Sequence, residues 1–289
     1  MNIIVVNTFK RPFHTRLCLE SICRAQRWYP WASKIAVCQR HDQETEMAQN
    51  VSRETKGVIE RNFELPLEIW IEPEPMTPHT ASKWMLDMAF CQSEEVDAVL
   101  YCEDDVLLSP DAFMLLEWFQ QTVPVMHVHK MLGVCLYHET VPEQYIPNPP
   151  DPRRLHLSNG LNTCGGTMFL RKPYLDILSP NWNCKVVEPK GFDYSAHYLM
   201  YLHKLYMAYP DLSRSMNIGW SGGSLSQKQW ADHCGRSIWV QSHNAARQVN
   251  GFFFEQVREG QGKDALYPDP VLEQWMIPEI KHQEVMEGR

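Results

Sequence analysis

Short apolar runs alternate with amphipathic or polar stretches over residues 1–110, and this alternation limits the possible folds more than any other feature. The apolar runs, which predict strands, are Asn2–Val6, Lys34–Cys38, Leu67–Ile71 and Val96–Cys102. The stretches between them, which predict helices, are Phe13–Arg27, Glu44–Asn62 and Thr80–Phe90. Strands that alternate with helices favour an α/β fold, in which a mostly parallel sheet carries helices on both faces.

The second half of the sequence is less regular. Prolines crowd residues 142–152 and predict an irregular loop, while Cys164–Leu170 predicts a glycine turn that leads into a short strand. A further helix is expected over Phe192–Lys204. With 289 residues, 44% of them hydrophobic, the chain can bury a substantial core. We expect a single domain with halves 1–110 and 111–250, followed by a C-terminal extension, 251–289.

Three consecutive carboxylates, Glu103, Asp104 and Asp105, follow the last apolar run of the first half. Ser109 and Pro110 then predict a helix N-cap and a first-turn proline, with a helix that begins near Asp111. The carboxyl ends of parallel strands are where open α/β sheets bind their ligands. Carboxylates this close repel one another unless a cation joins them, and Mn²⁺ or Mg²⁺ prefers such oxygen ligands. A solvated acidic turn is the alternative.

The order of these segments resembles that of GT-A-fold glycosyltransferases, most of all the N-acetylglucosaminyltransferase I family. The matching segments are Asn7–Arg11 with Arg16–Leu19, Ile35–Thr45, Ser82–Leu86, Glu103–Asp105 with Ser109–Phe113, and Tyr209–Gly219. The resemblance implies a GT-A fold with a Rossmann-like sheet and an irregular acceptor-side half. It also implies transfer of a sugar from a UDP-sugar donor to an acceptor hydroxyl, with inversion, in the presence of Mn²⁺ or Mg²⁺.

The resemblance also implies roles for the acidic residues. Asp105 corresponds to the direct metal ligand, Asp104 would lie towards the donor ribose or sugar, and Glu103 would support them from behind. The metal would act as a Lewis acid for the departing diphosphate. His243 lies late in the chain, where many GT-A enzymes supply a histidine to the metal.

Five other residues match donor-binding positions of the family. Arg11 would pair with phosphate oxygens, Asp42 would accept a hydrogen bond from the base, and Lys83 is a second candidate for the phosphates. The turn at Gly165 and Gly166 would let the backbone approach the donor sugar, because glycine has no side chain to obstruct it. For Arg11, an ordinary surface arginine is the alternative.

Asp193 is the candidate catalytic base, because inversion requires a carboxylate that takes the proton of the acceptor hydroxyl. The family has two adjacent acids at this place, whereas this sequence has one, between Phe192 and Tyr194. The alignment of this sequence with the family at Asp193 is therefore uncertain by one residue. A helix N-cap is the alternative reading of Asp193, and both roles are compatible.

The acceptor is not determined by the sequence. Residues 1–150 hold 12 Lys and Arg against 21 Asp and Glu, whereas residues 151–250 hold 11 against 6, so the net charge changes from −9 to +5. A basic acceptor side suits an anionic partner such as hydroxymethylated DNA, although these charges are also compatible with solvated faces and with a glycan or protein acceptor. An inactive sugar-binding domain would be expected to lose the acidic triplet.

A nucleotidyltransferase would normally carry a glycine-rich phosphate loop after the first strand, and residues 7–12 contain no glycine. No apolar segment is long enough to span a bilayer, and the sequence starts at the first expected strand without a signal-peptide pattern. The nine cysteines are odd in number and scattered, which favours reduced thiols. We therefore expect a cytoplasmic protein with no membrane span.

Overall fold

The computed structural model describes residues 1–9, 11–39, 41, 46–62, 65–122, 130–137, 154–158, 166–182, 192–210, 213–219 and 253–254. Its strands are β1 (Asn2–Asn7), β2 (Lys34–Gln39), β3 (Leu67–Ile71), β4 (Ala98–Glu103), β5 (Val106–Leu108), β6 (Met131–Cys135), β7 (Arg154–Ser158), β8 (Thr167–Leu170), β9 (Tyr206–Pro210), β10 (Ser215–Asn217) and β11 (Phe253–Phe254). Its longer helices are α1 (Pro12–Trp28), α2 (Glu46–Asn62), α3 (Pro78–Cys91), α4 (Ala112–Thr122) and α7 (Phe192–His203). Between β8 and α7 lie the short helices α5 (Arg171–Pro173) and α6 (Ser179–Asn181), with a π-helical turn, η2 (Tyr174–Leu178), between them.

The main sheet has the strand order β11-β7-β9-β6-β8-β4-β1-β2-β3 in the part of the chain that the structure describes. Five of its eight neighbouring pairs are parallel: β1–β2, β1–β4, β2–β3, β6–β9 and β7–β11. The antiparallel pairs are β4–β8, β6–β8 and β7–β9. The predicted mostly parallel α/β sheet is therefore confirmed.

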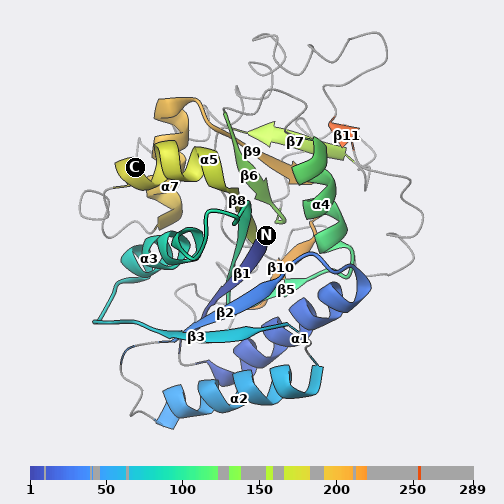
Figure 1. The fold of residues 1–289 in the computed structure, drawn as a ribbon, viewed down its shortest axis with the longest axis vertical. Helices are drawn as coiled ribbons and strands as arrows, with labels where there is room; N and C mark the ends of the chain where they lie inside the picture. The colour runs from blue at the N-terminus through green and yellow to red at the C-terminus, as the bar shows by residue number, and fades with distance from the viewer. Residues whose placement is uncertain are drawn as a thin grey trace.

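Helices lie on both faces of this sheet (Figure 1), and a hydrophobic core is packed against each face. Alternate residues of β1 separate them, since Ile4 faces α1 and α4, whereas Ile3 faces α3 and α7. One core gathers side chains such as Leu19 of α1 and Phe113 of α4, and the other gathers Phe90 of α3. Helices on both faces, as predicted, follow from this alternation.

The elements of the first half begin and end close to their predicted bounds. Helix α1 starts at Pro12, directly after Arg11, and α3 starts at Pro78 after the N-cap Thr77, whose side chain accepts a hydrogen bond from the Thr80 backbone. In the second half the structure adds β6, β7 and β9 to the sheet, which the sequence patterns did not predict. None of the described helices has both the length and the apolar character that crossing a membrane requires.

The N-cap of α4 differs from the prediction. The helix starts at Ala112, and the Leu115 backbone N–H donates to the Asp111 carbonyl at 3.2 Å, which puts Asp111 at the cap position. Ser109 instead donates its hydroxyl to the Asp111 carboxylate at 2.6 Å. The predicted Ser109 cap is therefore wrong, because Ser109 is held in a different arrangement, with its backbone N–H bonded to the Arg214 carbonyl at 2.8 Å.

A second, two-stranded sheet connects the two halves of the chain. It pairs β5 with β10 in antiparallel register, with Asn217 opposite Val106 and Ser215 opposite Leu108. Because β5 starts only two residues after the end of β4, this pairing brings the segment at 213–219 to the carboxyl end of β4. That end of the sheet is where the candidate site lies.

Candidate functional site at the carboxyl edge of the sheet

The site forms where β1 and β4 end side by side. These strands are parallel neighbours, and their last residues, Asn7 and Glu103, are paired in the register. The loop after β1 and the two residues after β4 therefore leave the sheet together. The Thr8 backbone N–H and hydroxyl both donate to the Cys38 carbonyl of β2, at 3.0 and 2.6 Å, and this fixes the start of the loop.

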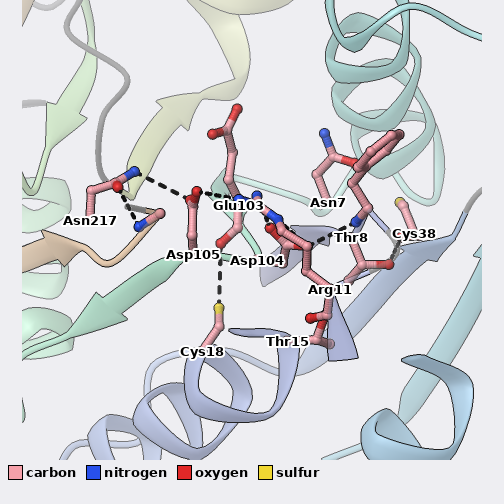
Figure 2. Close-up of polar contacts among 12 residues, drawn as sticks. Asn7, Thr8, Arg11, Thr15, Cys18, Cys38, Glu103, Asp104, Asp105 and Asn217 are labelled. Carbon is pink, nitrogen blue, oxygen red and sulfur yellow. Dashed lines mark hydrogen bonds and ion pairs between the residues drawn. The ribbon is translucent and has the colours of Figure 1, made fainter. Parts of the chain in front are cut away.

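Arg11 lies between this loop and the acidic residues (Figure 2). Its carbonyl accepts hydrogen bonds from the backbone N–H and the hydroxyl of Thr15, each at 2.9 Å, so the backbone of Arg11 is held by the first turn of α1. Its guanidinium donates through Nη1 to Asp105 Oδ2 at 3.0 Å, and through Nη2 and Nε to the two oxygens of Asp104, the second at 3.4 Å. We call Arg11, Asp104 and Asp105 the open cluster.

The open cluster holds one positive and two negative side chains in a largely buried place. Burial raises the pKa of Asp104 to about 6, the positive charge of Arg11 opposes that shift, and the neighbouring Asp105 adds to it. The Asp104 carboxylate also accepts a hydrogen bond from the Phe9 backbone N–H at 2.9 Å. Although burial disfavours its charge, the two carboxylates raise the pKa of Arg11, which remains a cation. With both carboxylates ionised, the cluster carries a net charge of −1.

The segment at 217–219 covers Asp105 from the other side. The Asn217 side-chain amide donates to Asp105 Oδ1 at 3.3 Å, and the Ile218 backbone N–H donates to the Asp105 carbonyl at 2.7 Å. A Cβ on Gly219 would lie 2.2 Å from Asp105 Oδ2, so only glycine fits here without a shift of the carboxylate. The sequence analysis did not assign these residues a role, although they belong to the last segment of the family resemblance.

A fully enclosed ion pair stabilises the same segment. The Arg214 guanidinium donates through Nε to Asp111 Oδ2 at 2.8 Å, and both side chains are 0% exposed. The backbone N–H of Arg214 donates to the Leu136 carbonyl at 2.6 Å. This enclosed pair, Asp111 and Arg214, joins the start of α4 to the strand that carries Asn217.

His14 is a further site residue that the sequence analysis missed. It is buried on the first turn of α1, three residues after Arg11, and it interacts with Asp105 and with the Ile218 backbone. Burial and the positive charge of Arg11 lower its pKa, although Asp105 and the Ile218 backbone oppose that shift. The one available signal was its spacing, because residues three apart on a helix share a face.

The structure places the other predicted site residues less directly. Glu103 ends β4, its carbonyl accepts a hydrogen bond from the Cys18 thiol at 3.5 Å, and its carboxylate points away from those of Asp104 and Asp105 (Figure 2). Gly166 packs behind the triplet, where a Cβ would lie 3.3 Å from both the Cys102 sulfur and a methyl carbon of Leu108. Its missing side chain therefore serves core packing at this position.

Lys83 lies on α3, and its described polar partners belong to a different network. Its ammonium pairs with Asp87 and donates to the Ser179 hydroxyl at 3.2 Å, while Asp87 also accepts from the Ser179 and Tyr174 hydroxyls at 2.7 and 2.8 Å. The network connects α3 with the π-helical turn and α6. None of these contacts brings Lys83 to the open cluster.

Four predicted residues are placed only partly or not at all. Asp193 is the second residue of α7, within its first turn. Asp42, Gly165 and His243 lie outside the described residues. Their roles stay predictions.

The donor set is compatible in kind with a hard metal ion. Carboxylate oxygens such as those of Asp105 are ligands that Mn²⁺ and Mg²⁺ prefer. Among the residues that the structure describes, however, no three His, Cys, Asp or Glu side chains form a group that would hold a metal ion. A metal ion at Asp105 therefore stays a prediction.

No protein-family model matches the sequence, and no curated protein matches it. Solved structures with a similar arrangement include a glycosyltransferase involved in glycosylation of the major capsid of PBCV-1 (TM-score 0.29, 11% identity, over 65% of this chain and 68% of that one). Another is a nucleoside-diphosphate-sugar pyrophosphorylase from Vibrio cholerae RC9 (TM-score 0.40, 11% identity, over 76% of this chain and 96% of that one). A third is the inositol-1-phosphate CTP transferase from T. maritima (TM-score 0.40, 8% identity, over 78% of this chain and 92% of that one). Likenesses at this level assign neither family nor activity, so function is argued from the site itself.

Proposed function

We propose that the protein is a glycosyltransferase that moves a sugar from a UDP-sugar to an acceptor hydroxyl with inversion, in the presence of Mn²⁺ or Mg²⁺. The observation that carries the proposal is the open cluster, in which Asp104 and Asp105 meet Arg11 at the carboxyl edge of a mostly parallel sheet. Ligands bind at this edge in open α/β sheets. A site that combines two carboxylates with an arginine suits a ligand made of a metal ion and a diphosphate.

Asp105 is the residue that would hold the metal ion, which when bound supplies Lewis-acid stabilisation to the leaving diphosphate. The Asn217 amide holds the Asp105 carboxylate, and the Ile218 backbone N–H holds the Asp105 backbone carbonyl. Arg11 would bind the phosphate oxygens, for which a guanidinium offers paired N–H donors. Asp104 would orient Arg11 and face the donor ribose or sugar.

Asp193 is the proposed general base, which would take the proton of the acceptor hydroxyl. Asp42 is the proposed partner of the uracil, and His243 a proposed additional metal ligand. Lys83 stays a proposed second contact to the phosphates, for which its ammonium would have to leave Asp87. The acceptor is proposed to be a glycan or protein hydroxyl, with hydroxymethylated DNA as the alternative that the +5 net charge of residues 151–250 favours.

The test is a screen of UDP-sugars for slow hydrolysis with Mn²⁺, because donor hydrolysis reports the sugar without a known acceptor. We expect one UDP-sugar to be hydrolysed, EDTA to abolish the reaction, and Asp105→Asn to abolish donor binding in calorimetry. With an acceptor, Asp193→Asn should retain donor binding and lower turnover by about 10²-fold or more. Asp176→Asn, at an exposed aspartate of the π-helical turn, is the matched control and should change neither quantity.

Hydrolysis of every UDP-sugar at the buffer rate, or full activity in EDTA, would contradict the proposal. The salt dependence of acceptor binding distinguishes a DNA acceptor from a neutral glycan. Binding of hydroxymethylated DNA should weaken steeply as salt rises, because phosphate contacts release counterions, whereas binding of a neutral glycan should not.

A further inference from the structure

The guanidinium of Arg11 lies between the carboxylates of Asp104 and Asp105 and is the cation that pairs with both. It donates to Asp105 through one terminal nitrogen and to both oxygens of Asp104 through its other two nitrogens. Two acidic side chains that close repel each other unless a cation joins them. In the structure, the cation that joins them belongs to the protein itself.

Both oxygens of Asp105 already have protein partners. Oδ2 accepts from Arg11 at 3.0 Å, and Oδ1 accepts from the Asn217 amide at 3.3 Å. Gly219 is packed against Oδ2 so closely that a Cβ there would lie 2.2 Å away. A metal ion that binds Oδ2 must therefore displace the guanidinium. A metal ion that binds Oδ1 would be repelled by the positive guanidinium on the other oxygen of the same carboxylate.

Separate contacts hold the backbone and the side chain of Arg11. The two hydrogen bonds from Thr15 hold its carbonyl at the start of α1, but they do not involve the guanidinium. The side chain is 16% exposed, whereas that of Arg214 in the enclosed pair is 0% exposed. The guanidinium thus borders solvent at the edge of the sheet, where an incoming diphosphate would approach.

We propose that Arg11 is an exchangeable counter-ion: without donor it neutralises Asp104 and Asp105 and opposes a divalent cation, and a diphosphate draws it away so that the cation takes its place on Asp105. The inference rests on the proposed function and deepens it. The diphosphate binds the guanidinium and thereby frees the carboxylate oxygens for the metal ion. The metal ion binds the carboxylate oxygens and thereby frees the guanidinium for the diphosphate. Metal and diphosphate then bind cooperatively, and the coupling must be equal in both directions.

The exchange predicts opposite effects of one substitution on two affinities. Arg11→Gln removes the competing charge, so Mn²⁺ alone should bind about tenfold tighter, as expected for loss of a nearby like charge. UDP with saturating Mn²⁺ should bind about tenfold more weakly, because the diphosphate loses its guanidinium partner. The free-Mn²⁺ signal in electron paramagnetic resonance measures the first affinity, and calorimetry with UDP measures the second.

Arg24→Gln is the matched control. Arg24 is exposed on the same helix, and its substitution changes the net charge by the same amount about 20 Å further along the helix axis. It should leave both affinities unchanged. If Arg11→Gln binds Mn²⁺ alone no more tightly than Arg24→Gln does, the exchange is wrong. A loss of both affinities would also overturn it, since Arg11 would then only hold the site together.

Arg11→Lys covers the case in which the glutamine variant does not fold. A lysine keeps the charge but not the planar set of donors, so we expect both changes in the same directions and of smaller size. Mn²⁺ affinity at or below that of the wild type would overturn the proposal. The exchange and the proposed function fail separately: opposite changes with no UDP-sugar hydrolysed would support the exchange alone, whereas hydrolysis with unchanged Mn²⁺ affinity would support the function alone.

Discussion

Two arginine–aspartate sites lie within the part of the chain that the structure describes, and they differ in charge balance and in exposure. In the enclosed pair one arginine meets one aspartate, both side chains are 0% exposed, and the Ser109 hydroxyl gives Asp111 a further hydrogen bond. In the open cluster one arginine meets two aspartates, and the arginine reaches solvent at the edge of the sheet. The enclosed pair is neutral, whereas the open cluster carries an excess negative charge.

This difference separates an ion pair that fixes structure from one that is suited to a ligand. A buried pair with matched charges gains from its geometry only as long as both partners remain, because either one alone is a buried unpaired charge. An unbalanced cluster at an open edge has charge left for a further cation. Ion pairs alone are therefore poor markers of function, and charge balance together with exposure is the more informative quantity.

The largest expected effect concerns the enclosed pair. Arg214→Met should lower the free energy of unfolding by about 3–5 kcal/mol, because Asp111 is left buried and unpaired. The double variant Asp111→Leu with Arg214→Met should recover most of the loss, since it removes both charges. Arg11→Gln should cost less than Arg214→Met, because Arg11 borders solvent and Asp104 takes up a proton instead. Urea unfolding in metal-free buffer measures the free energy of unfolding of all three variants. Equal losses in Arg214→Met and Arg11→Gln would contradict the distinction between the enclosed pair and the open cluster.

A second prediction uses the pKa of Asp104. Its folded-state pKa of about 6 lies above its ordinary value of 3.8, so the folded state binds the proton more tightly than the unfolded chain does. Stability from this group is complete below pH 4, is lost as the pH rises from 4 to 6, and is absent above that range. The loss amounts to about 3 kcal/mol.

Asp104→Asn removes this titration. The difference in unfolding free energy between the wild type and Asp104→Asn should therefore fall by about 3 kcal/mol between pH 4 and pH 7, measured in EDTA. Asp176→Asn, at an exposed position, should show no such trend. If the profiles of wild type and Asp104→Asn run parallel, Asp104 keeps an ordinary pKa and the open cluster is less buried than its geometry indicates.

The smallest effect tests how closely the open cluster is packed. Gly219→Ala places a methyl group against the Asp105 carboxylate and should cost about 1–3 kcal/mol, the range typical of overpacking. It should also weaken Mn²⁺ binding in the presence of UDP, because Asp105 must shift. Gly166→Ala is the matched substitution, and it should cost less because its nearest neighbours are side-chain atoms at 3.3 Å. Thermal unfolding and the Mn²⁺ titration check both, and an unchanged Mn²⁺ affinity in Gly219→Ala would argue against the role of Asp105.

The sequence by itself determined the first half of the fold to within a few residues at each element boundary. Its strands are continuous apolar runs, and its helices have local start signals such as Pro12 and Pro78. The position of Asp104 and Asp105 at a strand end was also predictable, because the strand and the carboxylates are adjacent in the sequence. These signals are local, so no knowledge of the remaining chain was needed.

Only the tertiary structure decided which groups complete the site. Arg11 meets Asp105 across 94 residues, Arg214 meets Asp111 across 103, and Asn217 meets Asp105 across 112. The parallel pairing of β1 with β4 creates the first contact, and the pairing of β5 with β10 creates the other two. A composition or spacing pattern cannot specify these contacts, because strand order and pairing depend on which distant surfaces pack together. The same packing encloses Arg214 and leaves Arg11 at the open edge of the sheet.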